Sequence, residues 1–123
     1  MELNKEDTDK FETYMEYIGE GSIKKSLIGI VLWLLSKEKM HGYKLIDVLI
    51  TEFNLQTMGA SKIYPILKKL EKEGFITAEK EKQGKRVKKV YSITKKGKEM
   101  MDFTKKFMSQ NKMMRQFFKE MMT

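Results

Sequence analysis

The chain has 123 residues, with 25 Lys or Arg against 17 Asp or Glu, so its formal net charge is +8. This length suits one domain with a modest core, and 41% hydrophobic residues suffice to fill that core. The lack of cysteine excludes disulfides and thiolate chemistry, and His41 is the only imidazole available for a metal site or a catalytic triad. No nucleophile–base pair, carboxylate cluster or phosphate-binding glycine loop emerges. We therefore expect no enzyme activity, no catalytic residues, no metal and no cofactor.

The hydropathy pattern excludes a membrane-spanning segment. The longest apolar run, Leu27 to Leu35 with Gly29 inside it, falls short of the roughly 20 residues that a transmembrane helix needs. The N-terminus, MELNKEDTDKFE, is acidic and lacks the pattern of a signal peptide. We expect a cytoplasmic protein with no membrane partner.

Charge is distributed unevenly along the chain. Residues 1–20 carry a net charge of −5, whereas residues 62–98 hold thirteen Lys or Arg and four Glu, a net of +9. A basic region of this density is either a solvated face or the footprint of a polyanion. Taken alone, the solvated face is the commoner explanation.

An amphipathic helix is predicted for residues 1–21. Asp9 and Glu12 have the spacing of a capping box, and apolar residues follow at helical intervals: Phe11, Tyr14, Met15 and Ile18. We interpret this helix as a strut between subunits, and the alternative is a frayed extension.

Three helices are predicted next. Ser22 can cap a central core helix whose body, LIGIVLWLL, is apolar on nearly every side. A second helix runs from about His41 to Phe53. A third starts at Gly59 or Ala60 and ends at Glu73, with Gly74 placed as its left-handed cap.

The helix from residue 59 to 73 has two unlike sides. Its apolar side consists of Ile63, Ile66, Leu67 and Leu70, and lysines project from the other. Pro65 conflicts with a continuous helix, because proline lacks the N–H that bonds the preceding turn. Either the helix is kinked at this residue, or it starts only at Pro65 after a separate turn.

A β-hairpin and a long helix complete the chain. Residues 75–82 and 86–93 are typical of two strands joined by a basic turn around Gly84. Thr94 can cap a final helix, 94–123, whose seam has the three-and-four spacing of a helix that pairs with another helix. The predicted dimerisation residues are Met100, Phe103, Phe107, Gln110, Met114, Phe117 and Met121.

This order of elements is typical of a winged helix-turn-helix domain over residues 22–93. A helix of that width enters the major groove of DNA, and a basic hairpin tip reaches phosphates or the adjacent minor groove. The expected fold is therefore mainly α, with a small β-hairpin wing and a long C-terminal helix.

Three strings resemble the PadR family of transcriptional regulators. They are HGY at residues 41–43, IYPILKKLEKEGFI at residues 63–76 and YSITKKG at residues 91–97. The resemblance covers Ser22 to about Gly97, and the tail is similar to the single C-terminal helix of the short subfamily. It implies a dimeric repressor that binds inverted-repeat operators, a hydrophobic inducer pocket in many members, and a recognition helix that contains Pro65. Ser61-Lys62 replaces the family's usual Gly-Thr pair, so no operator sequence carries over.

The candidate DNA-binding residues lie on the lysine side of this helix and on the hairpin. The Tyr64 hydroxyl could donate to a phosphate oxygen, and the planar fork of Arg86 suits a narrow minor groove. Each could instead be a solvated or packing residue. The full set is Ser61, Lys62, Tyr64, Pro65, Lys68, Lys69, Lys85, Arg86 and Lys88.

Three further residues have a structural and a functional interpretation. His41 is interpreted as a residue at a helix start or in the core rather than a ligand, and Tyr43 as structural. Trp33 is interpreted first as a core residue, and its alternative is the floor of a pocket for a flat hydrophobic effector.

The sequence predicts a dimeric, sequence-specific transcriptional regulator of double-stranded DNA. The rival hypothesis is a winged-helix module whose basic face binds protein or RNA instead of operator DNA.

Overall fold

The computed structural model describes residues 5–6, 9, 22–53 and 59–123, and within these ranges the side chains of residues 22–26, 107 and 108 are outside the described part. The amphipathic helix predicted for residues 1–21 therefore lies almost entirely outside the described residues.

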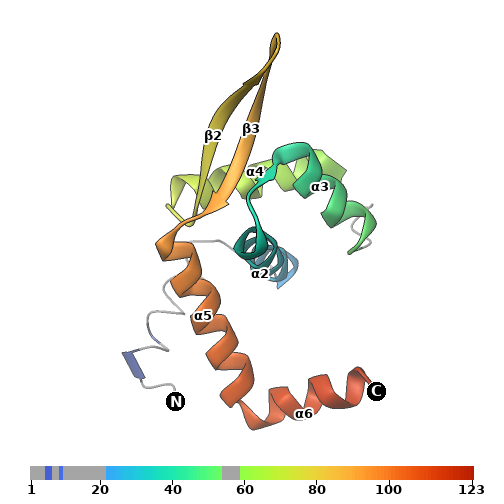
Figure 1. The fold of residues 1–123 in the computed structure, drawn as a ribbon. Coiled ribbons are helices and arrows are strands. Elements are labelled where there is room, and N and C mark those ends of the chain that lie inside the picture. Colours follow the sequence, from blue (N-terminus) through green and yellow to red (C-terminus); the bar gives the residue numbers. More distant parts are fainter. Residues whose placement is uncertain (1–4, 7–8, 10–21, 54–58) are drawn as a thin grey trace.

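Between residues 22 and 75 the described part of the chain has three helices before the hairpin, as predicted for this stretch. Helix α2 spans Ser22–Lys37, α3 spans Gly42–Thr51 and α4 spans Gly59–Lys72 (Figure 1). Helix α3 ends two residues before the predicted Phe53, which stands exposed beyond it. Helix α4 is continuous through Pro65, so of the two alternatives the helix that contains the proline is the one observed.

The three strands in the described residues form one antiparallel sheet. Strand β1 spans Met40–His41, β2 spans Ile76–Gln83 and β3 spans Arg86–Ile93, in the spatial order β1-β3-β2. The hairpin was predicted, but β1 was not, because two residues are too few to show the alternation that marks a strand. β1 pairs Met40 with Tyr91 and so attaches the start of α3 to the wing.

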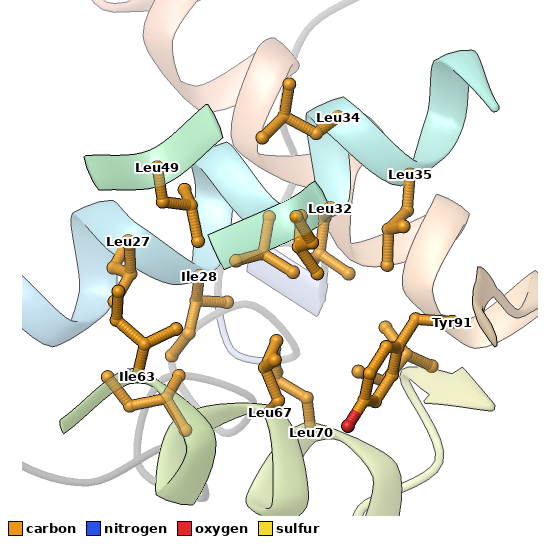
Figure 2. Packing of buried hydrophobic residues seen from close by; sticks show 14 of the residues in the cluster. Leu27, Ile28, Leu32, Leu34, Leu35, Leu49, Ile63, Leu67, Leu70 and Tyr91 are labelled. Atoms are coloured by element: carbon orange, nitrogen blue, oxygen red, sulfur yellow. The ribbon is translucent and has the colours of Figure 1, made fainter. Parts of the chain in front are cut away.

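The core surrounds α2. Its side chains meet those of α3 and α4, and Tyr91 of β3 closes one side beside Leu67 and Leu70 (Figure 2). Met100, from the last helical part of the chain, is 1% exposed and belongs to the same cluster. The winged-helix unit thus has a single apolar centre, to which the first turns of the C-terminal region contribute.

The predicted single C-terminal helix is two helices. Helix α5 spans Lys95–Gln110 and α6 spans Lys112–Met121, and α6 turns sharply away from α5 (Figure 1). The break is at Asn111, whose backbone is extended and whose side-chain oxygen accepts a hydrogen bond from the Met114 N–H at 3.0 Å. Asparagine is among the best N-cap residues, and here it starts a new helix within the expected seam.

Helix α4 ends as the sequence predicted. Gly74 has φ +83°, a conformation that glycine adopts without steric cost. The Gly74 N–H donates to the Glu71 carbonyl and the Phe75 N–H to the Leu70 carbonyl, which together form a Schellman motif. This cap fixes the direction in which the chain leaves α4 and enters β2.

The start of α5 is bonded to the end of α4. The Thr94 hydroxyl accepts from the Gly97 N–H at 3.1 Å, as expected for an N-cap, and donates to the Gly74 carbonyl at 2.6 Å. The Lys96 ammonium donates to the Glu73 carbonyl at 2.7 Å. A Cβ at residue 97 would overlap the Phe75 carbonyl oxygen, so only glycine permits this approach.

No helix in the described part of the chain is long and apolar enough to span a membrane. Nor does that part contain a group of three or more acidic or histidine side chains that could hold a metal ion.

Candidate nucleic-acid interface

Helix α4 separates core from surface along its whole length. Its buried side chains are those predicted from helical spacing: Ile63, Ile66, Leu67 and Leu70. The exposed side brings together the predicted candidates Ser61, Lys62, Tyr64, Pro65, Lys68 and Lys69. The core therefore holds the helix, and the basic side is left free for a partner.

Pro65 lies on the exposed side of α4 and alters the backbone there. Because proline has no backbone N–H, residue 65 cannot donate the usual helical hydrogen bond to the Ser61 carbonyl. Ser61 and Lys62 are both exposed, so this change in the backbone falls on the basic side of the helix.

The hairpin supplies a second basic surface. The Gln83–Arg86 pair closes a two-residue turn of Gly84 and Lys85, and both Lys85 and Arg86 are exposed. The hairpin projects well beyond the helices (Figure 1). Its tip can therefore reach a surface that also contacts α4.

Tyr43 joins the wing to the start of α3, a role that the sequence did not predict. The residue is 61% exposed, and its ring stacks on that of His41 with 5.7 Å between centroids and lies 4.9 Å from the Lys88 ammonium. Pairing of β1 with β3 creates this arrangement, and no local sequence signal indicates it.

His41 is at a helix start, as interpreted, but it is not a satisfied core residue. It is the N-cap of α3 without a side-chain capping bond, and its buried Nε2 has no hydrogen-bond partner among the residues that the structure describes. That atom lies 3.8 Å from a carboxylate oxygen of Glu81.

Tyr91 anchors the wing to α4. Burial raises the pKa of its hydroxyl, and the nearby Glu71 carboxylate and Tyr64 raise that pKa further. Tyr91 is therefore neutral at physiological pH and serves as an apolar ring between β3 and α4.

Trp33 lies outside the core, so its first interpretation, as a core residue, is wrong. Its side chain is 44% exposed on α2, with the Lys37 ammonium 5.5 Å from the ring centroid. The apolar run around it misled the prediction, because α2 is not enclosed on every side in this chain. Its exposure leaves the ring available to a ligand.

The predicted dimerisation residues differ in their surroundings. Met100 and Phe103 pack on the core of this chain, whereas Gln110 and Met114 are half-buried, and the side chain of Phe107 is outside the described part. Phe117 and Met121 on α6 are exposed, with three neighbouring apolar residues that the predicted seam omitted: Met113, Phe118 and Met122.

Comparisons with known proteins agree with this geometry. The model of the transcriptional regulator PadR-like family matches residues 31–102. No curated protein matches the sequence.

Three solved structures illustrate the likeness. A Streptococcus transcriptional regulator is 27% identical, with a TM-score of 0.64, over 80% of this chain and 98% of its own. Bacillus subtilis PadR in complex with operator DNA is 40% identical, with a TM-score of 0.55, over 63% of this chain and 45% of its own. A PadR-like regulator from Bacillus cereus is 34% identical, with a TM-score of 0.54, over 68% of this chain and 47% of its own.

The match thus spans about half the length of the two Bacillus proteins and nearly all of the Streptococcus one. The fold and the family are those of transcriptional regulators rather than enzymes. Because the family model covers more than half of the chain, this protein belongs to the PadR-like family of transcriptional regulators.

Proposed function

We propose that this protein is a homodimeric repressor that binds an inverted-repeat operator in double-stranded DNA. The observation that carries the proposal is the exposed basic side of α4 beside a basic wing, in a chain similar to a PadR whose structure contains operator DNA. A helix with its apolar side held by the core and its cationic side free has the form that major-groove recognition requires.

Residues along α4 divide between base reading and backbone contact. Ser61 and Lys62, near the helix start, approach base edges, because the first turns of a recognition helix enter the groove deepest. Lys68 and Lys69 lie further along and contact phosphates, which supply affinity without sequence information. The Tyr64 hydroxyl donates to a phosphate oxygen, and Pro65 brings the backbone close.

The wing supplies the remaining contacts. Lys85 and Arg86 at the turn reach the neighbouring minor groove. Lys88, the remaining candidate on the hairpin, has its ammonium 4.9 Å from the Tyr43 ring centroid, so the wing contacts assigned to DNA are those of the turn. The guanidinium of Arg86 is the best suited of these to a narrow minor groove.

Dimerisation completes the proposed DNA-binding surface. The exposed apolar side of α6, with Phe117 and Met121 at its centre, packs against a second copy, and Met114, Gln110 and Phe107 extend that contact towards α5. Met100 and Phe103 support it from the core of each subunit. Two-fold symmetry then sets two α4 helices about one turn of DNA apart.

A flat hydrophobic effector would bind at Trp33. Its exposed ring on α2 offers a stacking surface, and family resemblance favours such a ligand. Quenching of the single tryptophan by planar aromatic compounds, together with release of operator DNA, tests this role. A Trp33→Leu variant that keeps DNA binding but still releases DNA with the same compounds would place the effector elsewhere.

The decisive experiment selects bound fragments from genomic DNA with the purified protein. We expect enrichment of a palindromic sequence, bound at least about a thousandfold more tightly than a random duplex of equal length. Equal affinity for both duplexes would contradict sequence-specific regulation, and no binding to either would favour a protein or RNA partner.

Two lysine variants test the division of roles on α4. Lys62→Ala should lower affinity for the selected operator more than for random DNA, whereas Lys69→Ala should lower both alike. Equal losses on both duplexes for both variants would contradict the assignment.

A further inference from the structure

Strand register sorts the side chains of the wing onto two unlike faces. Directly paired residues of an antiparallel ladder share a face, and successive pairs alternate between faces. Pairing is continuous from Ile76–Ile93 to Gln83–Arg86. One face therefore consists of the pairs Ile76–Ile93, Ala78–Tyr91, Lys80–Lys89 and Lys82–Val87.

The outer part of this face, Lys80, Lys82 and Lys89, has three positive charges and no acid, and we name it the lysine face. The opposite face has Lys88 and Arg86, whose charges Glu79 and Glu81 offset; we name it the mixed face. Composition alone shows only a basic hairpin, whereas the register shows that one side holds the net charge.

The lysine face is the side of the hairpin that turns towards α4. At its base Ile76 and Tyr91 belong to the core, and the Tyr91 ring lies beside Leu67 and Leu70 of α4 (Figure 2). The hairpin continues past α4 (Figure 1). The three lysines therefore stand beyond the core, on the face of the hairpin that packs towards α4 at its base.

This cluster is unfavourable in the protein alone. Lys80 is directly opposite Lys89, and like charges in that position destabilise a strand pair. Lys82 lies on the same face, two residues after Lys80 in β2. All three are exposed, and within the described part of the chain none has an ion-pair partner. A polyanion on this face would remove the repulsion.

Lys88 on the mixed face already has partners. It is directly opposite Glu81, and its ammonium lies 4.9 Å from the Tyr43 ring centroid. The contact with Tyr43 joins the wing to α3, and together with the neighbouring Glu81 it reduces what Lys88 can offer to an external anion.

We propose that Lys80, Lys82 and Lys89 form the phosphate-binding face of the wing, and that Lys88 mainly positions the wing against Tyr43. This inference rests on the proposed DNA binding and adds residues to that site. The ligand is the sugar–phosphate backbone of duplex DNA, so the contribution is independent of sequence.

Adjacent lysines on opposite faces provide a matched test. Lys89→Gln and Lys88→Gln each remove one charge from neighbouring positions of β3. Affinity for a random-sequence duplex is measured by fluorescence anisotropy over a series of salt concentrations. We expect Lys89→Gln to weaken binding severalfold and to reduce the log–log salt slope by about 1 for each phosphate that the variant no longer neutralises. Lys88→Gln should leave the slope nearly unchanged.

A stability measurement separates this role from a structural one. Because Lys89→Gln removes the repulsion from Lys80, its urea midpoint should equal or exceed that of the wild type while its DNA affinity falls. The triple variant Lys80→Gln, Lys82→Gln, Lys89→Gln should show both effects enlarged.

The failure of this inference can be told apart from that of the proposed function. Suppose that the wild type binds the duplex and that Lys88→Gln lowers the salt slope as much as Lys89→Gln does. This inference is then overturned, and the proposed function still stands. A wild type that binds no duplex overturns both.

Discussion

Helices α4 and α6 are both amphipathic, yet α4 exposes its polar side to solvent and α6 exposes its apolar side. Helix α4 buries its apolar side in the core and exposes lysines, whereas no residue of α6 is buried and its exposed residues include Phe117 and Met121. A ten-residue helix is marginal on its own in water. The apolar side of α4 is therefore buried within one chain, whereas that of α6 stays exposed, and the proposed dimer would cover it.

Removal of α6 should have the largest effect. A chain that ends at Gln110 lacks the exposed apolar residues but keeps Met100 and Phe103 in the core. We expect a monomer by light scattering that still unfolds cooperatively. Its affinity for a palindromic operator should fall to that for a half-site, because the second α4 is no longer tethered.

The same truncated protein could contradict this account in two ways. If it remained dimeric, the interface would lie elsewhere, for example in residues 1–21. If it were monomeric with full operator affinity, the dimeric mechanism would be wrong.

Matched truncations of one apolar side chain in each helix test the contrast directly. Leu67→Ala in α4 should lower the free energy of unfolding by about 2–5 kcal/mol, because it leaves a cavity in the core. Phe117→Ala in α6 should leave the unfolding of the isolated monomer nearly unchanged and weaken the dimer instead. Denaturant unfolding and sedimentation at several protein concentrations distinguish the two. A large monomer destabilisation by Phe117→Ala would mean that α6 packs within its own chain.

The junction between the two regions should tolerate no side chain at residue 97. In Gly97→Ala the new methyl would overlap the Phe75 carbonyl oxygen and lie 2.8 Å from Cγ1 of Ile93. We expect a loss of about 1–3 kcal/mol in urea unfolding, since backbone must shift. Gly29→Ala is the control, because no atom beyond its chain neighbours and the nearby backbone of α2 lies within 4 Å of the added Cβ. In a helix this change should be neutral or stabilising by up to about 1 kcal/mol. Equal effects of both variants would show that the approach of Gly97 to Phe75 is not a constraint.

Local features of the fold were predictable from the sequence. The buried residues of α4, the left-handed cap at Gly74, the hairpin and the cap at Thr94 all follow from helical spacing or turn chemistry within a few residues. Each of these signals lies inside the element that it specifies. The basic side of α4 was predictable for the same reason.

Features that depend on distant residues were not predictable. Strand β1 exists only through its pairing with β3, and the contact between Tyr43 and Lys88 follows from that pairing. The spacing of Met100 fits an apolar helix face in either case, whether the side chain packs in the core of its own chain or against a second copy. At Asn111 a local signal was present, but the seven-residue apolar repeat around it favoured an uninterrupted helix.

The smallest expected effect is that of Tyr91, which lies between β3 and α4 in the winged-helix unit. Burial, Glu71 and Tyr64 raise the pKa of its hydroxyl in the folded state, so the folded chain retains this proton at a pH where the unfolded chain releases it. Below the unfolded pKa of about 10 both states are protonated, and Tyr91 contributes no pH dependence. As the pH rises above that value, the free energy of unfolding should fall by up to about 1.4 kcal/mol per pH unit from this group. Tyr91→Phe cannot titrate at this position, so its stability should decline less steeply than that of the wild type above about pH 10 in urea unfolding at constant ionic strength. Parallel curves for the two proteins would show that the hydroxyl is not held neutral between β3 and α4.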